Sequence, residues 1–305
     1  MRFWQALTWA ETEQIPELAV IAEELGFDGV FLSDHAFVPR DATSLYPYAA
    51  DGKPSFTAAS EYPDVWVLLG AIAARTRALS LATSVFVLPL RHPIEVARAA
   101  ASLAVVSGGR FALGVGVGWG EEQYEALGVD FASRGRRADE CIEVLRKLWQ
   151  PGWVEHRGEF FAFPPMRQNP APRDPVPIWV GGHSRAALRR AARLGDGFLG
   201  SGHTPDGAER VLGELVALRR ACGRERAAFE TVIGLSTPPD LDTFLRLEDR
   251  GMTSGVSYPF RHALGERSSL DAKRRAMEAF AERILVPMRA RRGVSEAAPG
   301  SAGGR

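Results

Sequence analysis

Hydrophobic residues along the chain follow two alternating patterns. Short, continuous apolar runs, such as residues 27–32 and 110–117, have the length and composition of buried β-strands. Between these runs, apolar residues recur every three or four positions, as Leu18, Ala22 and Leu25 do, which predicts amphipathic helices. The strands are expected at residues 2–8, 27–32, 79–87, 110–117, 177–180, 196–201, 229–235 and 255–258. The helices are expected at residues 15–25, 64–75, 94–106, 121–127, 135–149, 184–194, 205–221, 240–250 and 270–288.

Eight strands, each followed by at least one helix, predict an α/β fold, a closed (β/α)8 barrel of the TIM class. The strands are too continuously apolar to have one face in water, which favours a barrel covered by helices over an open sheet. We place this single domain at residues 1–288. Residues 289–305 are rich in Gly, Ala, Ser and Arg, and we expect them to be a disordered tail. Two long insertions, about 36–62 and 151–177, are expected at the carboxyl-terminal face of the barrel, where such folds carry their function.

Charge and composition narrow the possible partners. The 305 residues contain 37 basic and 37 acidic side chains, so there is no basic surplus for binding nucleic acid. The apolar runs are too short for a membrane span or a signal peptide. Two cysteines give no disulfide framework, and the six histidines show no metal-binding spacing. We therefore expect a cytoplasmic protein that acts on a small molecule without a metal.

Two glycine-containing segments follow late strands and precede helices. Gly181, Gly182 and Ser184 lie between the fifth strand and its helix, and Ser201 and Gly202 follow the sixth strand. Free backbone N–H groups and the helix dipole at such a position can hold a phosphate. The alternative is a plain helix cap at Ser184 after a glycine turn.

Glycines also alternate at the end of the fourth strand. Gly116 and Gly118 belong to the segment VGVGWG, in which one strand face lacks side chains. Such a face either lets the strand bend or lets a flat ring lie against the backbone. The segment is no dinucleotide fingerprint, because it lies mid-chain and lacks the acidic residue expected after the next strand.

Titratable residues follow the second and fourth strands. Asp34 and His35 end the second strand, at the position where a barrel exposes catalytic side chains. An imidazole can exchange a proton near neutral pH, and a neighbouring carboxylate can set its charge. The alternative for His35 is a surface residue in a loop. Glu122 opens a helix, where the dipole alone would stabilise an acid.

Four stretches, in the same order, resemble the luciferase-like monooxygenase superfamily, and within it the branch of probable F420-dependent oxidoreductases. They are AEELGFDGVFLSDH (22–35), LATSVFVLPLRHPIEVA (81–97), SGGRFALGVGVGWGEEQYEALGV (107–129) and PIWVGGHSRAALRRAARLGDGFL (177–199). F420 is a deazaflavin, which moves two electrons as a hydride and largely ignores oxygen. The resemblance therefore implies a barrel that binds F420, with FMN as the alternative cofactor.

The resemblance also implies roles for single residues. Family members have a bulge with a non-proline cis peptide behind the ring, at positions that match Thr83, Ser84 and Val85. His35 is implied to face the reactive carbon of the deazaflavin. Trp119 stands where better-known members have a glutamate that donates a proton, so Glu122 is a candidate acid nearby.

Three function classes follow from the resemblance and the residues. The first is hydride transfer between F420 and a small organic substrate. The second is an FMN-dependent two-component monooxygenase, which would need the same phosphate seat. The third is a non-catalytic flavin-binding barrel, since a fold does not fix a function. The alanine-rich helix at residues 94–106 can approach a partner closely, and we expect a homodimer.

Overall fold

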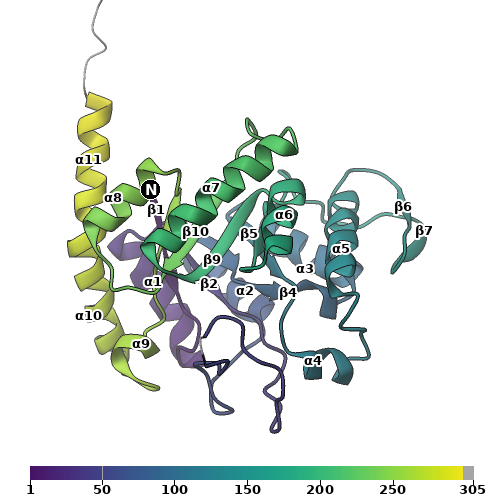
Figure 1. Ribbon diagram of the computed structural model, residues 1–305, viewed down its shortest axis with the longest axis horizontal. Helices are drawn as coiled ribbons and strands as arrows, with labels where there is room; N and C mark the ends of the chain where they lie inside the picture. The colour runs from purple at the N-terminus through teal and green to yellow at the C-terminus, as the bar shows by residue number, and fades with distance from the viewer. Residues whose placement is uncertain (50, 298–305) are drawn as a thin grey trace, which may run out of the picture.

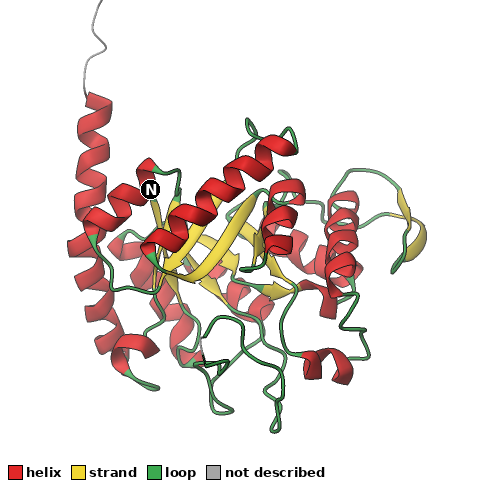
Figure 2. Cartoon of the chain, in the orientation of Figure 1, coloured by secondary structure: helices red, strands yellow, loops and turns green. Residues whose placement is uncertain are grey.

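The computed structural model describes residues 1–49 and 51–297, and its centre is a closed parallel barrel. Figure 2 shows the strands in yellow in the middle, with the helices around them. The barrel strands are β1 (Arg2–Ala6), β2 (Gly29–Leu32), β3 (Ser80–Thr83) with β4 (Phe86–Val87), β5 (Phe111–Gly116), β8 (Ile178–Gly181), β9 (Gly197–His203), β10 (Glu230–Leu235) and β11 (Ser254–Ser257). β1 pairs in parallel with both β2 and β11, and this pairing closes the barrel.

Helices cover the outside of the barrel and connect its strands (Figure 1). They are α1 (Ile15–Leu25), α2 (Val65–Arg75), α3 (Pro93–Val106), α4 (Glu121–Ala126), α5 (Arg134–Leu148), α6 (Arg185–Leu194), α7 (Pro205–Ala221), α8 (Leu241–Asp249), α9 (Arg261–Leu264), α10 (Leu270–Phe280) and α11 (Val286–Ala297). Short 3-10 turns lie at Thr12–Gln14 and Leu88–Leu90, and a π-helical segment, Ala281–Leu285, joins α10 to α11. The (β/α)8 barrel predicted from the hydrophobic pattern is confirmed.

Side chains on each strand alternate between the barrel interior and the layer under the helices. Trp4, Phe31 and Trp179 fill the interior, where the Trp4 and Trp179 rings meet edge to face with centroids 5.3 Å apart. Phe3, which follows the opposite face of β1, packs with the helices. A Cβ atom at Gly29 would lie 2.3 Å from the Trp4 ring, so a residue this large fits only beside a glycine.

A buried ion pair connects the loop after β1 to α10. The Lys273 Nζ donates to Glu11 Oε2 (2.5 Å), Gln14 Oε1 (2.9 Å) and the Ser268 carbonyl oxygen (2.6 Å). The two charged side chains are 2% and 6% exposed. Burial opposes ionisation of Glu11, but the hydrogen bonds from Lys273 and Ser268 outweigh it and lower the pKa of the carboxyl. Removal of either partner would leave the other as an unpaired buried charge, which would destabilise this side of the barrel.

Three expectations from the sequence need correction. The third strand is not continuous over residues 79–87, because Ser84 and Val85 interrupt it between β3 and β4. The second insertion was expected at the carboxyl-terminal face, but it follows α5 and precedes β8. It forms a hairpin, β6 (Val154–Arg157) and β7 (Ala162–Met166), which packs beside α5. Only the first insertion follows the carboxyl end of a strand. Figure 1 shows β6 and β7 far from that loop.

The carboxyl-terminal boundary also differs. Helix α11 runs from Val286 to Ala297 and so continues past Met288, where the sequence analysis ended the domain. Arg and Ala are good helix formers, and a single glycine at position 293 does not end the helix. The part of the predicted tail at residues 298–305 lies outside the described residues.

Candidate active site

The carboxyl end of the barrel is covered by the loop 36–62, which follows β2. Figure 1 shows this loop at the bottom of the view, on the side of α4. Its aromatic rings contact residues that follow other strands: Tyr46 lies 5.2 Å from Trp119 and Tyr48 lies 4.6 Å from His183, between ring centroids. The loop therefore brings together the ends of β2, β5 and β8.

The interruption between β3 and β4 is a bulge, residues 84–85, with a cis peptide bond between Ser84 and Val85. The Ser33 hydroxyl donates to the Ser84 carbonyl oxygen at 2.7 Å, and the Asp34 N–H donates to the Val85 carbonyl oxygen at 3.3 Å. The Thr83 hydroxyl donates to the Gly114 carbonyl oxygen at 2.7 Å. The loop after β2 thus holds the bulge from one side and β5 holds its beginning from the other.

The glycines at the ends of β5 and β8 make room for the bulge. A Cβ at Gly116 would lie 2.5 Å from Val85 Cγ2, and a Cβ at Gly181 would lie 2.5 Å from Val85 Cγ1. At Gly118, whose φ is +67°, a Cβ would lie 2.8 Å from Val87 Cγ1. The sequence predicts either a bend or the approach of a flat ring at these glycines. The structure adds a third reason, which is that both methyl groups of Val85 occupy hollows left by glycine.

Asp34 supports the bulge instead of setting the charge of His35. Its Oδ2 accepts the Val87 N–H at 3.1 Å, and its Oδ1 lies 3.1 Å from the Arg91 guanidinium. Burial raises the pKa of Asp34, although Arg91 and the Val87 N–H oppose the rise. The expectation that the neighbouring carboxylate acts directly on the imidazole is therefore wrong: Asp34 is a positioning residue.

His35 lies inside a cluster of aromatic rings, which we call the ring cluster: His35, Tyr46, Phe56, Tyr62 and Trp119. The His35 ring centroid is 4.9 Å from Phe56, 5.0 Å from Tyr62 and 6.3 Å from Trp119. Burial lowers the pKa of His35 to about 4, because a charged imidazole would lose hydration among these rings. His35 is therefore neutral at pH 7, and it is no surface residue.

Gln123 on α4 is the polar neighbour of His35. Its amide Nε2 lies 3.1 Å from each nitrogen of the His35 ring. Its Oε1 is buried and has no hydrogen-bond partner among the described residues. An unpaired acceptor next to the imidazole is a contact that a bound ligand can complete.

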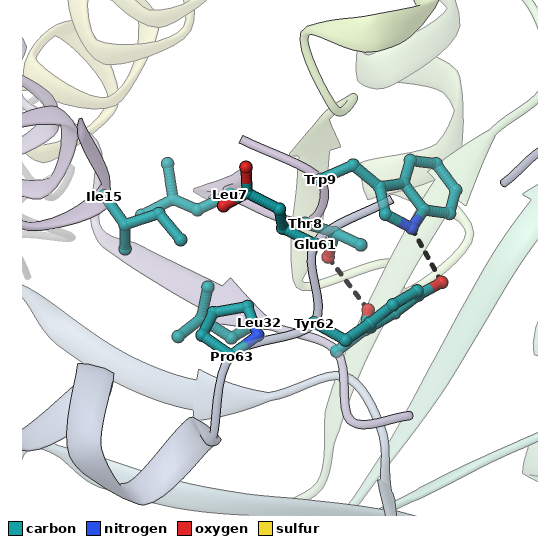
Figure 3. Close-up of a pocket in the computed structure, with 9 residues that line it drawn as sticks. Leu7, Thr8, Trp9, Ile15, Leu32, Glu61, Tyr62 and Pro63 are labelled. Carbon is teal, nitrogen blue, oxygen red and sulfur yellow. Dashed lines mark hydrogen bonds between the residues drawn. The ribbon is translucent and has the colours of Figure 1, made fainter. Parts of the chain in front are cut away.

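Tyr62 closes the ring cluster on the side of β1. The Trp9 indole N–H donates to the Tyr62 hydroxyl at 2.6 Å, and Figure 3 shows the two side chains facing each other. Burial raises the pKa of Tyr62 strongly and raises that of Tyr46 to about 12. Both hydroxyl groups therefore keep their protons at neutral pH, whereas the neutral His35 ring carries one N–H and one nitrogen that can accept a proton.

Glu122 anchors the covering loop. Its Oε1 accepts hydrogen bonds from the Thr43 N–H (2.6 Å), the Thr43 hydroxyl (3.1 Å) and the Ser44 N–H (2.9 Å). Partial burial works against ionisation, but the N–H groups of Ser44 and Thr43 outweigh it and lower the pKa to about 2. A carboxyl group this acidic is ionised at neutral pH, so Glu122 is a loop anchor and a poor proton donor.

The first predicted phosphate seat lies where β8 turns into α6. Ser184 caps the helix, since its hydroxyl oxygen accepts the Ala187 N–H at 3.2 Å. Gly182 has a φ of +131°, which favours glycine, and a Cβ there would lie 2.9 Å from Ala187 Cβ. The helix cap is present, and the other N–H groups of the first turn of α6 have no partner within the helix. Capping and anion binding are thus compatible at this turn.

The second predicted seat, Ser201 and Gly202, lies in β9, which extends to His203. The Gly202 N–H donates to the Tyr258 hydroxyl at 3.1 Å, so this N–H is already used. The His203 ring lies against His183, tilted by 31°, with centroids 4.3 Å apart. Its Nε2 is buried without a partner among the described residues, and burial lowers its pKa to about 4, with His183 adding to the effect.

Sequence reasoning missed Ser33, Gln123 and the contacting rings of His183 and His203. Their contacts join segments far apart in sequence, and no local pattern marks them. Within the described part of the chain, no group of three or more His, Cys, Asp or Glu side chains is placed to hold a metal ion. No helix among residues 1–49 and 51–297 is long and apolar enough to cross a membrane.

Comparison with known sequences agrees with this arrangement. The family model described as luciferase-like monooxygenase matches residues 3–242. The uncharacterized protein Rv0940c of Mycobacterium tuberculosis is 38% identical over 288 residues, which cover 94% of this chain and 99% of the relative. An F420-dependent glucose-6-phosphate dehydrogenase of Nakamurella multipartita is 33% identical over 273 residues, which cover 87% of this chain and 75% of the relative.

Solved structures share the fold at low sequence identity. The monooxygenase RslO1 from Streptomyces bottropensis has a TM-score of 0.76 at 20% identity, over 94% of this chain and all of the other. An F420-dependent secondary alcohol dehydrogenase, solved with an F420-acetone adduct, has a TM-score of 0.72 at 17% identity, over 93% and 98% of the two chains. At these identities the likeness concerns the barrel fold.

Proposed function

Because this chain belongs to the luciferase-like monooxygenase family, we propose that it is an F420-dependent oxidoreductase, which moves a hydride between the deazaflavin and a small organic substrate. The F420-dependent dehydrogenase at 33% identity supports the choice of cofactor. The observation that carries the proposal is the placement of His35, a half-buried neutral imidazole inside the ring cluster and in the loop that holds the bulge.

The residues at the carboxyl end of the barrel fit a cofactor with a flat ring and a phosphate. Val85, seated over Gly116 and Gly181, would support the ring, with Thr83 and Ser84 fixing the bulge behind it. Gly182 and the first turn of α6 would hold the phosphate, with Ser184 as the cap. Ser201 and His203, at the end of β9, border the same seat, and the unpaired His203 Nε2 is left for a ligand. When bound, F420 supplies a carbon that accepts or donates a hydride.

Acid and base roles follow from the opposite pKa shifts within the ring cluster. Burial lowers the pKa of His35 to about 4, so this ring is unprotonated at pH 7 and has one nitrogen free to accept a proton, whereas Tyr46 and Tyr62 stay protonated. We propose alcohol oxidation as the direction: F420 would supply the hydride acceptor, His35 would take the hydroxyl proton, and the product would be a carbonyl compound. Gln123, 3.1 Å from both ring nitrogens, orients the imidazole.

The test of this role is single-turnover kinetics with oxidised F420 and the best substrate from a panel of simple alcohols. We expect His35→Ala to lower the rate by about 10² to 10⁴, the contribution of a positioned proton-transfer group, and to leave the F420 dissociation constant within a few fold. His92→Ala, at the amino-terminal cap of α3, is the control and should keep the wild-type rate. Unchanged kinetics in His35→Ala would remove this residue from the mechanism.

An FMN-dependent monooxygenase is the second candidate function. The observation that favours it is that aromatic side chains of the loop 36–62 cover the site. These rings would keep water away from an oxygen-derived intermediate, and they would also keep water away from a hydride transfer. Turnover of FMN with a reductase and oxygen, but none of F420, would select this candidate. Binding of either cofactor without any turnover would instead support a non-catalytic barrel.

A further inference from the structure

A second cavity lies away from the ring cluster, between the carboxyl ends of β10 and β11 and the helices α8, α9 and α10. Its volume is about 270 Å³. Figure 1 shows α9 and α10 on the same side of the molecule. None of its lining residues belongs to the ring cluster. The ring of His262, in the lining, is 5.8 Å from that of Trp9, which donates to Tyr62.

The walls of this cavity are mostly apolar. They include Leu235, Phe244, Val256, Phe280 and Ile284. The cavity is open to solvent on one side, where its lining residues Thr237, His262, Ala263 and Arg283 are exposed. An engineered apolar cavity of about 150 Å³ stays dry and binds benzene, so about 270 Å³ accommodates an aromatic ring with a short substituent. Ala279, in the wall formed by α10, is exposed, which gives a small molecule access from solvent.

One polar atom in the wall has no partner. Gln5 is fully buried, and its Nε2 donates to the carbonyl oxygens of Ala6 (2.9 Å) and Tyr258 (3.2 Å). Because carbonyl oxygens only accept, these two bonds fix the orientation of the amide. The Gln5 Oε1 is then left as a buried acceptor without a partner among the described residues. A buried acceptor of this kind is stabilised by a ligand that carries a hydrogen-bond donor.

We propose that this cavity is a second small-molecule site, which takes a neutral, mainly apolar compound with one hydrogen-bond donor, such as an aromatic alcohol. The charged residue among its lining, Arg283, is exposed and already donates to the Pro239 carbonyl oxygen at 3.2 Å, so nothing in the wall selects for a charged ligand. The ligand sits beside Tyr258, whose hydroxyl holds the Gly202 N–H. The site does not depend on the identity of the cofactor.

The test is calorimetric titration of the full-length protein with benzyl alcohol and with toluene, which has the same ring without the donor. We expect benzyl alcohol to bind about five- to tenfold more tightly than toluene, the usual net effect of one hydrogen bond. Gln5→Leu should abolish this difference while toluene still binds. Equal affinities of the two compounds for the wild type would overturn the role of Gln5.

A second variant locates the site. Ala276→Phe on α10 places a ring in the cavity and should abolish binding of both compounds, while Arg275→Phe adds the same ring on the exposed side of the helix and should bind like wild type. Thermal unfolding of both variants checks that they are folded. Binding by Ala276→Phe at wild-type affinity would show that the compounds bind elsewhere, and would overturn the proposal even if Gln5→Leu failed to fold.

Discussion

Glycine at position 116 leaves space for a methyl group of Val85, and adding a Cβ atom at this position tests whether that packing matters. In Gly116→Ala the new Cβ would lie 2.5 Å from Val85 Cγ2, whereas carbon atoms in contact are about 3.5–4.0 Å apart, so the valine must shift by about 1 Å or more. It cannot turn its other methyl group away freely, because Cγ1 already occupies the hollow at Gly181. Overpacking of this kind costs about 1–3 kcal/mol.

The assay is a double-mutant cycle measured by urea unfolding. In the Val85→Ala background the clashing methyl group is gone, and the nearest valine atom that remains, Cβ, would lie 3.4 Å from the new Cβ. We therefore expect Gly116→Ala to cost about 1–2 kcal/mol less in that background than in the wild type. Gly114→Ala is the control on the same strand, since its Cβ would lie 1.9 Å from the Thr83 carbonyl oxygen and Val85→Ala cannot relieve this clash.

Equal costs of Gly116→Ala in both backgrounds would refute the packing explanation. Cofactor binding separates the remaining possibilities. If Gly116 is needed only to seat Val85, the double variant should fold and lose no more F420 affinity than Val85→Ala alone. If a ring contacts the backbone at Gly116 directly, the double variant should fold well and still lose binding.

Further predictions concern the phosphate seat, the covering loop, the buried ion pair and the oligomeric state. Gly182→Asp should weaken F420 binding at least tenfold more than Gly182→Ala. Both variants strain the backbone, but only the aspartate adds a negative charge where the phosphate would bind. Equal titration curves for the two variants would show that the turn only caps the helix. Glu122→Gln should speed amide exchange at residues 43 and 44 by about ten- to a hundredfold. Because the folded pKa of Glu122 is about 2 and its ordinary value is 4.5, the wild-type protection should be complete above pH 4.5 and should fall towards pH 2, and a pH-independent difference would contradict the anchor. Lys273→Met should lower the free energy of unfolding by about 3–5 kcal/mol, and adding Glu11→Gln should restore most of it; a loss below 1 kcal/mol in urea unfolding would speak against the pair. We also propose a homodimer through the outer helices, and light scattering that finds a monomer at micromolar concentration would disprove it.

The barrel could be predicted because the hydrophobic pattern of each strand and helix is visible in a short stretch of sequence and repeats along the chain. Apolar runs of strand length alternate with helical spacing eight times, and most breaks contain a glycine or proline, such as Gly26 or Pro93. The insertion 151–177 was misplaced because its composition does not say which end of the barrel it leaves from. Residues 289–297 are helical although their composition suggested disorder, since Arg and Ala also favour helix.

The candidate site was harder to predict, because its roles depend on neighbours. The bulge with its cis peptide bond lies at the residues that the family resemblance implied, and the implied role of His35 stays a prediction. The sequence did not show that the Asp34 carboxylate bonds to Val87 and Arg91. The sequence around a carboxyl group that follows a strand does not show whether the group transfers a proton or accepts a hydrogen bond from a backbone N–H. For the same reason Glu122 looked like an acid, and only the contacts from Thr43 and Ser44 identify it as an anchor.

The central claim is that the carboxyl end of this barrel binds F420 for hydride transfer, and side-by-side equilibrium titration of the purified apoprotein with F420 and FMN tests it most directly. The account predicts saturable F420 binding at least tenfold tighter than FMN binding, with the preference reduced in Gly182→Asp, which alters the seat at the start of α6. Tight FMN binding with negligible F420 binding would contradict it.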